Sequence, residues 1–286
     1  MNKRYLSIFQ MTACALLWSM SGFLIRLTPL NAMAISGVRS LLALLVLGGY
    51  LLLKRQKFLF NKQSLRVAVS LSGMLLSFVA ANKLTSPANA IILQYSAPIF
   101  MLLYCAIFRR QRFSLLDSST VTLTFLGIAL FFIDRISGGG LFGNLVAIGS
   151  GMFFAAMLLF SEGISEQTRI SGLFFGNLLT AVVGLPFALM PGTVFTAPIA
   201  VNLVLLGLFQ LGLPYLLYAF AIKRSTPLTC VLLATLEPLL SPVWVYLIVG
   251  EAPGRWALWG SVIVILAVTA NIALKQKAQA SDSASH

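Results

Sequence analysis

One carboxylate stands alone in a long apolar segment of the chain. Glu237 lies in "ATLEPLLSPVW" (234–244) and is the only charged residue between Pro227 and Val249. A charged side chain at the centre of a membrane costs about 2.5–3.5 kcal/mol on insertion-based scales, so such a group needs a proton, a partner or water. Loss of water favours the neutral acid and a nearby cation favours the carboxylate. Glu237 is therefore a candidate proton-coupling group or partner for a cationic solute, and the alternative is a structural carboxylate that pairs with Arg39.

The residues around Glu237 favour a cavity wall over a lipid-facing surface. At helical spacing, the residues on its face are small or polar beside one aromatic ring: Cys230, Ala234, Ser241 and Trp244. Pro238 and Pro242 each remove a backbone donor and loosen the helix. We expect these two prolines to act as hinges, with a kink of no functional consequence as the alternative.

Arg39 is the second charged residue placed deep in an apolar run. It lies eight or nine residues into the segment 31–53, within reach of snorkelling to the membrane surface. One interpretation is an anchor for a substrate carboxylate or a switchable partner for Glu237. The other is a structural salt bridge or a clamp on backbone carbonyls, which is the commoner fate of a membrane arginine.

The elements that must position these residues are membrane-spanning helices. Of the 286 residues, 59% are hydrophobic and 9% charged, whereas about 25% charged residues are usual in soluble domains. Apolar runs long enough to cross a hydrocarbon core of about 30 Å recur along the whole chain. We predict an all-α integral membrane protein with ten transmembrane helices and a disordered polar tail at 277–286, the helices spanning 6–25, 31–53, 65–82, 87–108, 115–133, 141–161, 170–190, 199–222, 227–249 and 255–274.

The basic residues indicate how the chain is oriented. The net charge of +13 would suggest nucleic acid as a partner of a soluble protein, but here the charges fall in particular short loops. Only four basic residues lie in loops on one side (Arg26, Lys83, Arg135 and Arg255). Fifteen lie on the side of the N-terminus, so the positive-inside rule predicts cytoplasmic N- and C-termini and no nucleic-acid partner.

The two halves of the chain are related by an internal repeat. A shift of 140 residues aligns 83–100 with 223–240 and superimposes Pro87 on Pro227 and Pro98 on Pro238. Because five spans are an odd number, the second copy enters the membrane in the opposite orientation, as in many secondary transporters. We predict a first repeat at 1–137 and an inverted repeat at 138–276, joined at the glycine-rich stretch 137–143.

The repeat extends the candidate site to the fourth span. Its equivalent face carries Gln94 as the polar group, and Ala97 stands where the second half has Glu237. Tyr104 and Trp244 correspond to each other and are candidate aromatic gates, with interfacial belt residues as the alternative. Pro98 is a third candidate hinge, and Trp18 and Gln210 are further mid-membrane candidates for the route, where helix-to-helix hydrogen bonding is the default role.

The residue inventory weighs against other classes of protein. An intramembrane hydrolase needs paired carboxylates, a serine with a base or a metal site, whereas this chain has one deep carboxylate and one histidine, His286, in the tail. No Walker loop appears, so direct use of ATP is not expected. Cys14, Cys105 and Cys230 show no metal-ligand spacing, and we interpret these cysteines as small packing residues. We therefore expect no cofactor or metal. A channel or scaffold without coupled transport is the alternative, although an inverted repeat favours alternating access.

Several motifs resemble one family across most of the chain, from about Leu6 to Leu274. "ALLWSMSGF" (15–23), "GVRSLLALLVL" (37–47) and "LATLEPLLSPVWVYLIVGEAP" (233–253) are similar to the drug/metabolite transporter superfamily, within it to EamA-type transporters. The resemblance implies alternating-access transport of small metabolites such as amino acids, driven by protons or exchange. We expect the transporter to be a monomer or homodimer in a bacterial inner membrane. The chain departs from the family at Gln111, which stands opposite Glu251.

Overall fold

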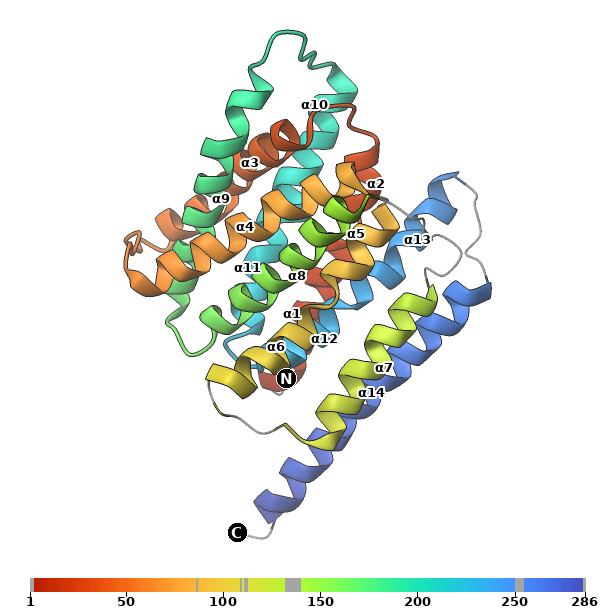
Figure 1. Cartoon of the computed structure of the whole chain (residues 1–286). Coiled ribbons are helices and arrows are strands. Elements are labelled where there is room, and N and C mark those ends of the chain that lie inside the picture. Colours follow the sequence, from red (N-terminus) through yellow and green to blue (C-terminus); the bar gives the residue numbers. More distant parts are fainter. Residues whose placement is uncertain are drawn as a thin grey trace.

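The computed structural model describes residues 3–85, 87–108, 110, 113–131, 140–249 and 255–284, and all regular structure in these ranges is helical (Figure 1). The helices of the first half are α1 (Lys3–Trp18), α2 (Ser21–Arg26), α3 (Ala32–Leu53), α4 (Lys62–Leu84), α5 (Pro87–Gln94), α6 (Ala97–Phe108) and α7 (Leu115–Phe131). Those of the second half are α8 (Leu141–Ser161), α9 (Glu166–Ala188), α10 (Ala197–Val204), the π-helix η1 (Leu205–Gly212), α11 (Leu213–Ala221), α12 (Pro227–Ala234), α13 (Leu236–Val249) and α14 (Arg255–Ala284).

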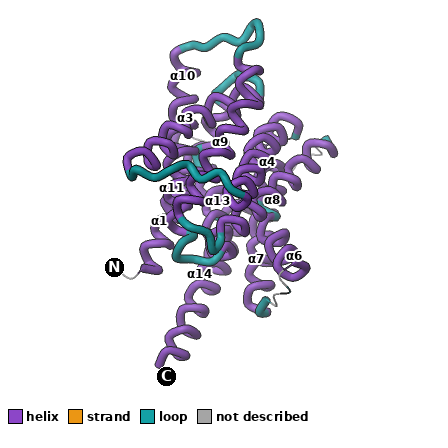
Figure 2. Tube along the Cα trace, turned by 90° about the vertical axis from the view of Figure 1, so that its left-hand side faces the viewer, coloured by secondary structure: helices purple, strands orange, loops and turns teal. Residues whose placement is uncertain are grey.

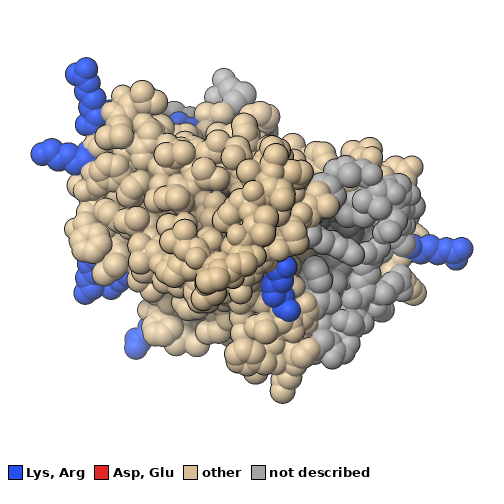
Figure 3. Space-filling model, turned by 90° about the horizontal axis from the view of Figure 1, so that it is seen from above, with Lys and Arg blue, Asp and Glu red and all other residues tan. Residues whose placement is uncertain are grey.

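Several helices have the length and composition of membrane spans. Among the described residues, α3, α4, α8, α9 and the continuous segment Ala197–Ala221 are each long and apolar enough to cross a bilayer. Large apolar side chains on them remain exposed, for example Leu45 at 65% and Val182 at 62%. Seen from above, the described surface is mainly uncharged, and its basic side chains lie mainly at the edges (Figure 3). This is the surface expected of a protein whose outer solvent is lipid.

Some predicted spans match single helices and others are divided. The predicted spans 31–53 and 141–161 coincide with α3 and α8 within one residue. The predicted spans 6–25, 87–108 and 227–249 are each split into two helices, and 199–222 contains the π-helix η1. The segment 277–284, expected to be disordered, forms the last turns of α14. Residues 137–139 of the predicted glycine joint at 137–143 lie outside the described residues, and its last three residues form the start of α8.

The packing of the central helices depends on glycine. α3 packs against α9, and α4 packs against both α8 and α9 (Figures 1 and 2). At the crossing of α3 and α9, a Cβ atom on Gly37 would lie 2.5 Å from the backbone carbon of Gly184. The two helices therefore touch backbone to backbone at a point two residues before Arg39.

The helices α7 and α14 form a pair beside the central bundle. They pack along each other and lie to one side in Figure 1, and the end of α14 lies at the same end of the molecule as the start of α1 (Figures 1 and 2). Asn271 of α14 donates its side-chain N–H to the Asp117 carboxylate (3.2 Å) and to Thr120 (3.1 Å) of α7. These buried contacts hold the pair together by hydrogen bonds inside an otherwise apolar contact.

A buried arginine fastens the loop between α8 and α9. Arg169 is 2% exposed, and its guanidinium donates to three carbonyl oxygens: Ser161 (2.9 Å), Ile164 (2.9 Å) and Ala219 (3.0 Å). The oxygens of Ser161 and Ala219 belong to the final turns of α8 and α11, where a cation complements the helix dipole. Beside this clamp, Glu166 accepts hydrogen bonds from Tyr50 (2.8 Å) and Lys223 (3.2 Å).

Candidate functional site

Three helices are interrupted at the same region of the bundle. At each break a side-chain hydroxyl bonds the carbonyl three residues earlier: Ser19 to Leu16 (2.6 Å), Ser96 to Leu93 (2.5 Å) and Thr235 to Leu232 (2.6 Å). Such bonds compete with the helical ladder and mark its end. The breaks after α5 and α12 lie 140 residues apart, at equivalent places of the predicted repeat.

Two prolines account for the position of the breaks after α5 and α12. In an α-helix each N–H bonds the carbonyl four residues earlier, and proline has no N–H. Pro98 therefore leaves the carbonyl of Gln94 without its helical donor, and Pro238 does the same to Ala234. Each helix accordingly ends at the orphaned carbonyl, and α6 or α13 begins within three residues of it.

The π-helix η1 forms the fourth irregular element. Gly207 allows η1 to lie against α3, because a Cβ atom there would approach Leu42 to 2.4 Å and the Arg39 carbonyl oxygen to 2.9 Å. Gln210 follows on η1 and is 5% exposed. A π-helical turn is rare and occurs frequently at functional sites.

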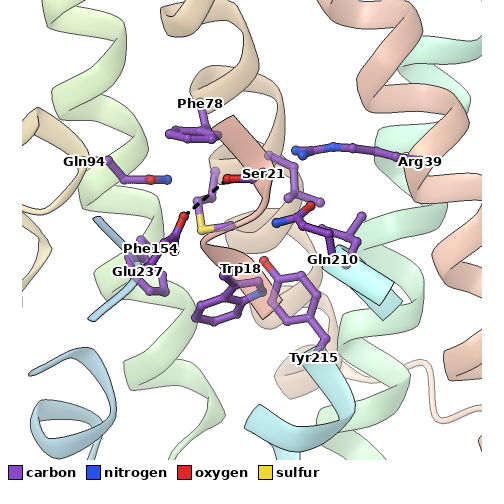
Figure 4. A pocket seen from close by; sticks show the side chains of 12 residues that line it. Trp18, Ser21, Arg39, Phe78, Gln94, Phe154, Gln210, Tyr215 and Glu237 are labelled. Carbon is purple, nitrogen blue, oxygen red and sulfur yellow. Dashed lines mark hydrogen bonds between the residues drawn. The ribbon is translucent and has the colours of Figure 1, made fainter. Parts of the chain in front are cut away.

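A cavity lies where these irregular elements meet (Figure 4). Its volume is about 40 Å³, which is room for a few water molecules. Its polar lining residues come from α2, α3, α5, η1, α11 and α13. The residues that line it are Trp18, Ser21, Arg39, Met74, Leu75, Phe78, Gln94, Phe154, Gln210, Leu211, Tyr215 and Glu237.

Glu237 enters the cavity from the first turn of α13. The Tyr95 hydroxyl donates to one carboxylate oxygen at 2.7 Å, and Ser21 of α2 donates to the other at 3.5 Å (Figure 4 draws the second bond). The positive end of the α13 dipole also favours an anion at this position. These donors make a charged Glu237 tolerable inside the bundle, while its half-buried side chain remains open to the cavity.

Arg39 faces the same cavity from the other side. In Figure 4 the Arg39 and Gln210 side chains lie on the right, and Glu237 and Gln94 lie on the left. Arg39 is 1% exposed, its Nε has no hydrogen-bond partner among the described residues, and the same is true of the Gln210 Oε1 atom. No ion pair within 4 Å joins Arg39 to Glu237, so the sequence-based alternative of a structural salt bridge between them is not present.

Aromatic rings form the apolar walls. Trp18 packs edge-on against Tyr215 (centroids 5.5 Å apart) and against Phe154 (6.0 Å). Phe78 lies on the far side of the cavity from Trp18 and Tyr215 in Figure 4. The cavity thus combines a cation, a carboxylate and amides with several ring faces, which suits an amphipathic solute.

Gln94 is fixed in place by hydrogen bonds to neighbouring helices. Its side-chain N–H donates to Ser150 of α8 (2.9 Å), and the Ser150 hydroxyl donates to the carbonyl of Met74 on α4 (3.2 Å). Because the N–H group is directed at Ser150, Gln94 presents a preorganised amide to the cavity.

The structure brings together five of the residues selected from the sequence. Trp18, Arg39, Gln94, Gln210 and Glu237 all line the cavity.

The remaining candidate residues lie away from the cavity lining, or their side chains lie outside the described part of the chain. Tyr104 is not among the lining residues and packs against the rings of Phe108 and Phe160, and Trp244 donates to the Ser19 hydroxyl (2.7 Å) at the α1–α2 break. Pro98 and Pro238 are buried beside the breaks. Ser241 and Pro242 belong to α13, but their side chains, like all of Gly250 and Glu251, are outside the described part of the chain.

Sequence reasoning did not select three residues that the structure places at the site. Ser21 and Tyr215 line the cavity, and Tyr95 lies directly behind Glu237. Tyr95 was missed because a continuous helix puts it on a different face from Gln94 and Ala97. The paired prolines were the signal, since each one locates an orphaned carbonyl four residues earlier.

No resident metal site emerges from the described residues, which contain no group of three or more His, Cys, Asp or Glu side chains close enough to hold an ion. Cys14, Cys105 and Cys230 are buried.

Comparison with known proteins agrees with this architecture. The sequence is 22% identical over 291 residues to solute carrier family 35 member G1 of Homo sapiens, covering 91% of this chain and 77% of that protein. It is 23% identical to the uncharacterized transporter YxxF of Bacillus subtilis (67% and 63% covered) and 25% identical to an uncharacterized transporter of Archaeoglobus fulgidus (67% and 69%). A solved protein crystal structure superposes with a TM-score of 0.80 at 17% identity, covering 96% of this chain and 99% of the other.

The family assignment rests on two long matches. Residues 6–133 and residues 141–273 both match the EamA-like transporter family, which confirms the resemblance noted in the sequence. The chain belongs to the EamA-like transporter family and is a multi-pass membrane transporter.

Proposed function

We propose that this protein is a secondary-active transporter that moves small zwitterionic solutes, such as amino acids, through the cavity by alternating access coupled to protons. The observation that carries the proposal is the placement of Arg39 and Glu237 on opposite sides of one cavity without an ion pair between them.

The two charges indicate the substrate class. A guanidinium binds a carboxylate through paired N–H donors, and the Arg39 Nε has no hydrogen-bond partner in the described part of the chain. A carboxylate such as Glu237 is the natural partner of an ammonium group. The rings of Trp18, Phe154 and Tyr215 would cover the apolar part of the solute.

Coupling follows from competition at one carboxylate. Glu237 binds either the ammonium group of the solute or a proton, because both neutralise the same charge. Exchange between the two states would link the solute gradient to the proton gradient. A neutral Glu237 is tolerated in the bundle, and a charged one is held by Tyr95 and Ser21.

The alternating-access part of the proposal is supported by the repeat. Both halves match the same family, and the breaks after α5 and α12 lie at equivalent positions. The contact of α4 with α8 has a counterpart in the contact of α1 with α11, while α3 pairs with α9 and α7 with α14. We propose two inverted five-helix repeats in a ten-span fold, with both termini in the cytoplasm of a bacterial cell.

The test combines binding with transport. Purified protein is screened by thermal shift against amino acids, amines, organic acids and nucleosides, and each ligand that stabilises it is tested for uptake into liposomes with and without a proton gradient. Arg39→Gln should weaken binding of the zwitterion by about 10- to 100-fold through loss of a charge-assisted hydrogen bond. The matched control Arg66→Gln changes an exposed arginine and should bind normally.

Glu237→Gln isolates the coupling step. We expect this variant to lose both the pH dependence of uptake and the response to a proton gradient, whereas Asp117→Asn, which changes a buried carboxylate away from the cavity, should keep both. Equal uptake rates for Glu237→Gln and the unaltered protein at every pH would refute proton coupling through this residue.

A further inference from the structure

The Tyr95 hydroxyl is shared between two acceptors on different helices. It lies 2.7 Å from the Glu237 carboxylate on α13 and 2.8 Å from the carbonyl oxygen of Ala234, the last residue of α12. A phenolic hydroxyl carries one proton, so at any moment it makes a full hydrogen bond to only one of them.

Both acceptors, the Ala234 carbonyl and the Glu237 carboxylate, are stabilised by a hydrogen bond from the Tyr95 hydroxyl. The Ala234 carbonyl has no helical donor because residue 238 is proline, and a buried carbonyl without a partner is costly. The carboxylate of Glu237, when charged, is the stronger acceptor. When Glu237 is protonated, its carboxyl group is a weaker hydrogen-bond acceptor, and the Ala234 carbonyl becomes the favoured acceptor.

Tyr95 is itself held firmly in place. It is 2% exposed, does not line the cavity, and its ring packs at 88° against Phe154 at a centroid distance of 6.4 Å. Its hydroxyl can therefore change partner by rotation alone, without movement of the ring.

We propose that Tyr95 is a positioning residue that transmits the protonation of Glu237 to the junction between α12 and α13. With Glu237 charged, the hydroxyl holds the first turn of α13 and leaves the end of α12 unbonded. With Glu237 protonated, the hydroxyl caps α12 and releases α13. Two arrangements of one junction are thereby tied to two charge states of one side chain, and by linkage the position of the junction sets the proton affinity of Glu237.

The surroundings of Glu237 leave this role to Tyr95. The other titratable or charged groups that face the carboxylate are Arg39 on α3, Tyr215 on α11 and Cys14 on α1. Among the described hydrogen bonds none of these three reaches Glu237, and Ser21 on α2 bonds it only at 3.5 Å. Tyr95 alone of these groups also bonds the end of α12.

The inference rests on the proposed function, in which Glu237 takes up a proton, and its test separates the two. Spin labels are placed at Thr226 and Leu247, exposed positions on either side of the junction, in the full-length purified protein. The distance between the labels is measured from about pH 5 to about pH 9, a range that covers titration of a buried carboxyl group. The infrared band of the protonated acid is followed in the same samples.

In the unaltered protein the distance should follow the acid band. Tyr95→Phe should keep the acid band but lose the change in distance, whereas Tyr104→Phe, which removes a hydroxyl away from the cavity, should behave like the unaltered protein. The double variant Tyr95→Phe with Glu237→Gln should match Glu237→Gln alone, because Tyr95 acts through Glu237.

A second variant covers the case in which Tyr95→Phe does not fold. Pro238→Ala gives the Ala234 carbonyl its own helical donor, so the distance should no longer respond to pH although the acid band still does. A distance that follows pH in Tyr95→Phe or in Pro238→Ala overturns the role of Tyr95 alone. A distance that follows pH in Glu237→Gln overturns the coupling role of Glu237 and the inference with it.

Discussion

The crossing of α3 and α9 offers a prediction whose size follows from the structure. In Gly37→Ala the new methyl group would meet the backbone of α9, with the Gly184 carbon and the Leu185 nitrogen both at 2.5 Å. Ordinary van der Waals contact begins at 3.4 Å, so the two helices must separate by about 0.9 Å. Overpacking of this kind costs about 1–3 kcal/mol, and no flexible side chain is present to absorb it.

The same helix supplies the matched control. Among the described residues, no heavy atom would lie within 4 Å of a Cβ atom at Gly49, so Gly49→Ala should raise the free energy of unfolding by about 0.5–1 kcal/mol through better helix propensity. Gly37→Ala should therefore be less stable than the unaltered protein and Gly49→Ala more stable. The free energies of unfolding of the two variants should differ by about 1.5–4 kcal/mol.

The displacement should also reach the site. Arg39 follows Gly37 by two residues on α3, and its backbone carbonyl abuts Gly207 of η1. If Arg39 binds the solute carboxylate as we propose, a shift of about 0.9 Å in α3 is enough to misplace its guanidinium, since productive geometry tolerates about 0.5 Å. Gly37→Ala should accordingly bind the zwitterionic solute more weakly than Gly49→Ala does.

The assay is thermal inactivation in detergent. Aliquots are heated, and the fraction that remains monodisperse is read by size-exclusion chromatography; a change of 1 kcal/mol moves the midpoint by about 2 °C in a chain of this size. Equal midpoints for Gly37→Ala and Gly49→Ala would show that the backbone contact between α3 and α9 is not tight, and would refute the reasoning.

Two further predictions test the clamp and the repeat. Arg169→Lys keeps the charge but places its three donors on one nitrogen, which cannot reach the carbonyl oxygens that the Nε, Nη1 and Nη2 atoms of the planar guanidinium bond separately. It should lower the free energy of unfolding by about 2–4 kcal/mol and the melting midpoint with it, whereas Arg66→Lys at an exposed site should leave the midpoint unchanged. Cysteines introduced at the exposed residues Lys83 and Lys223 should react with membrane-impermeant reagents from opposite sides of the membrane; reaction from the same side would be incompatible with inverted repeats.

The sequence determines the positions of the regular helices well and those of the breaks poorly. Hydropathy locates α3 and α8 within one residue because hydrocarbon demands an uninterrupted apolar run. It cannot separate α5 from α6 or α12 from α13, because both pieces of each pair are apolar. The break depends on an orphaned carbonyl and a nearby hydroxyl, and neither changes hydropathy.

The candidate site was predicted where charge or polarity marked it. Arg39, Gln94, Gln210 and Glu237 are costly in an apolar segment, and that cost points to a cavity. The prediction was less useful where it extended a helical face across a break, as at Tyr104, because a break changes the direction in which later side chains point. The contact of Tyr95 with Glu237 joins residues 142 positions apart and has no local signature.

The interrupted helices have a consequence for how this fold can diversify. The carbonyl groups released at the breaks belong to the main chain, so replacement of the lining side chains leaves them in place. Substitutions at Trp18, Phe78 or Gln210 can reshape the cavity while the junctions themselves, set by Pro98 and Pro238, stay intact. A transporter built in this way can acquire a new cargo over evolutionary time without rebuilding these junctions.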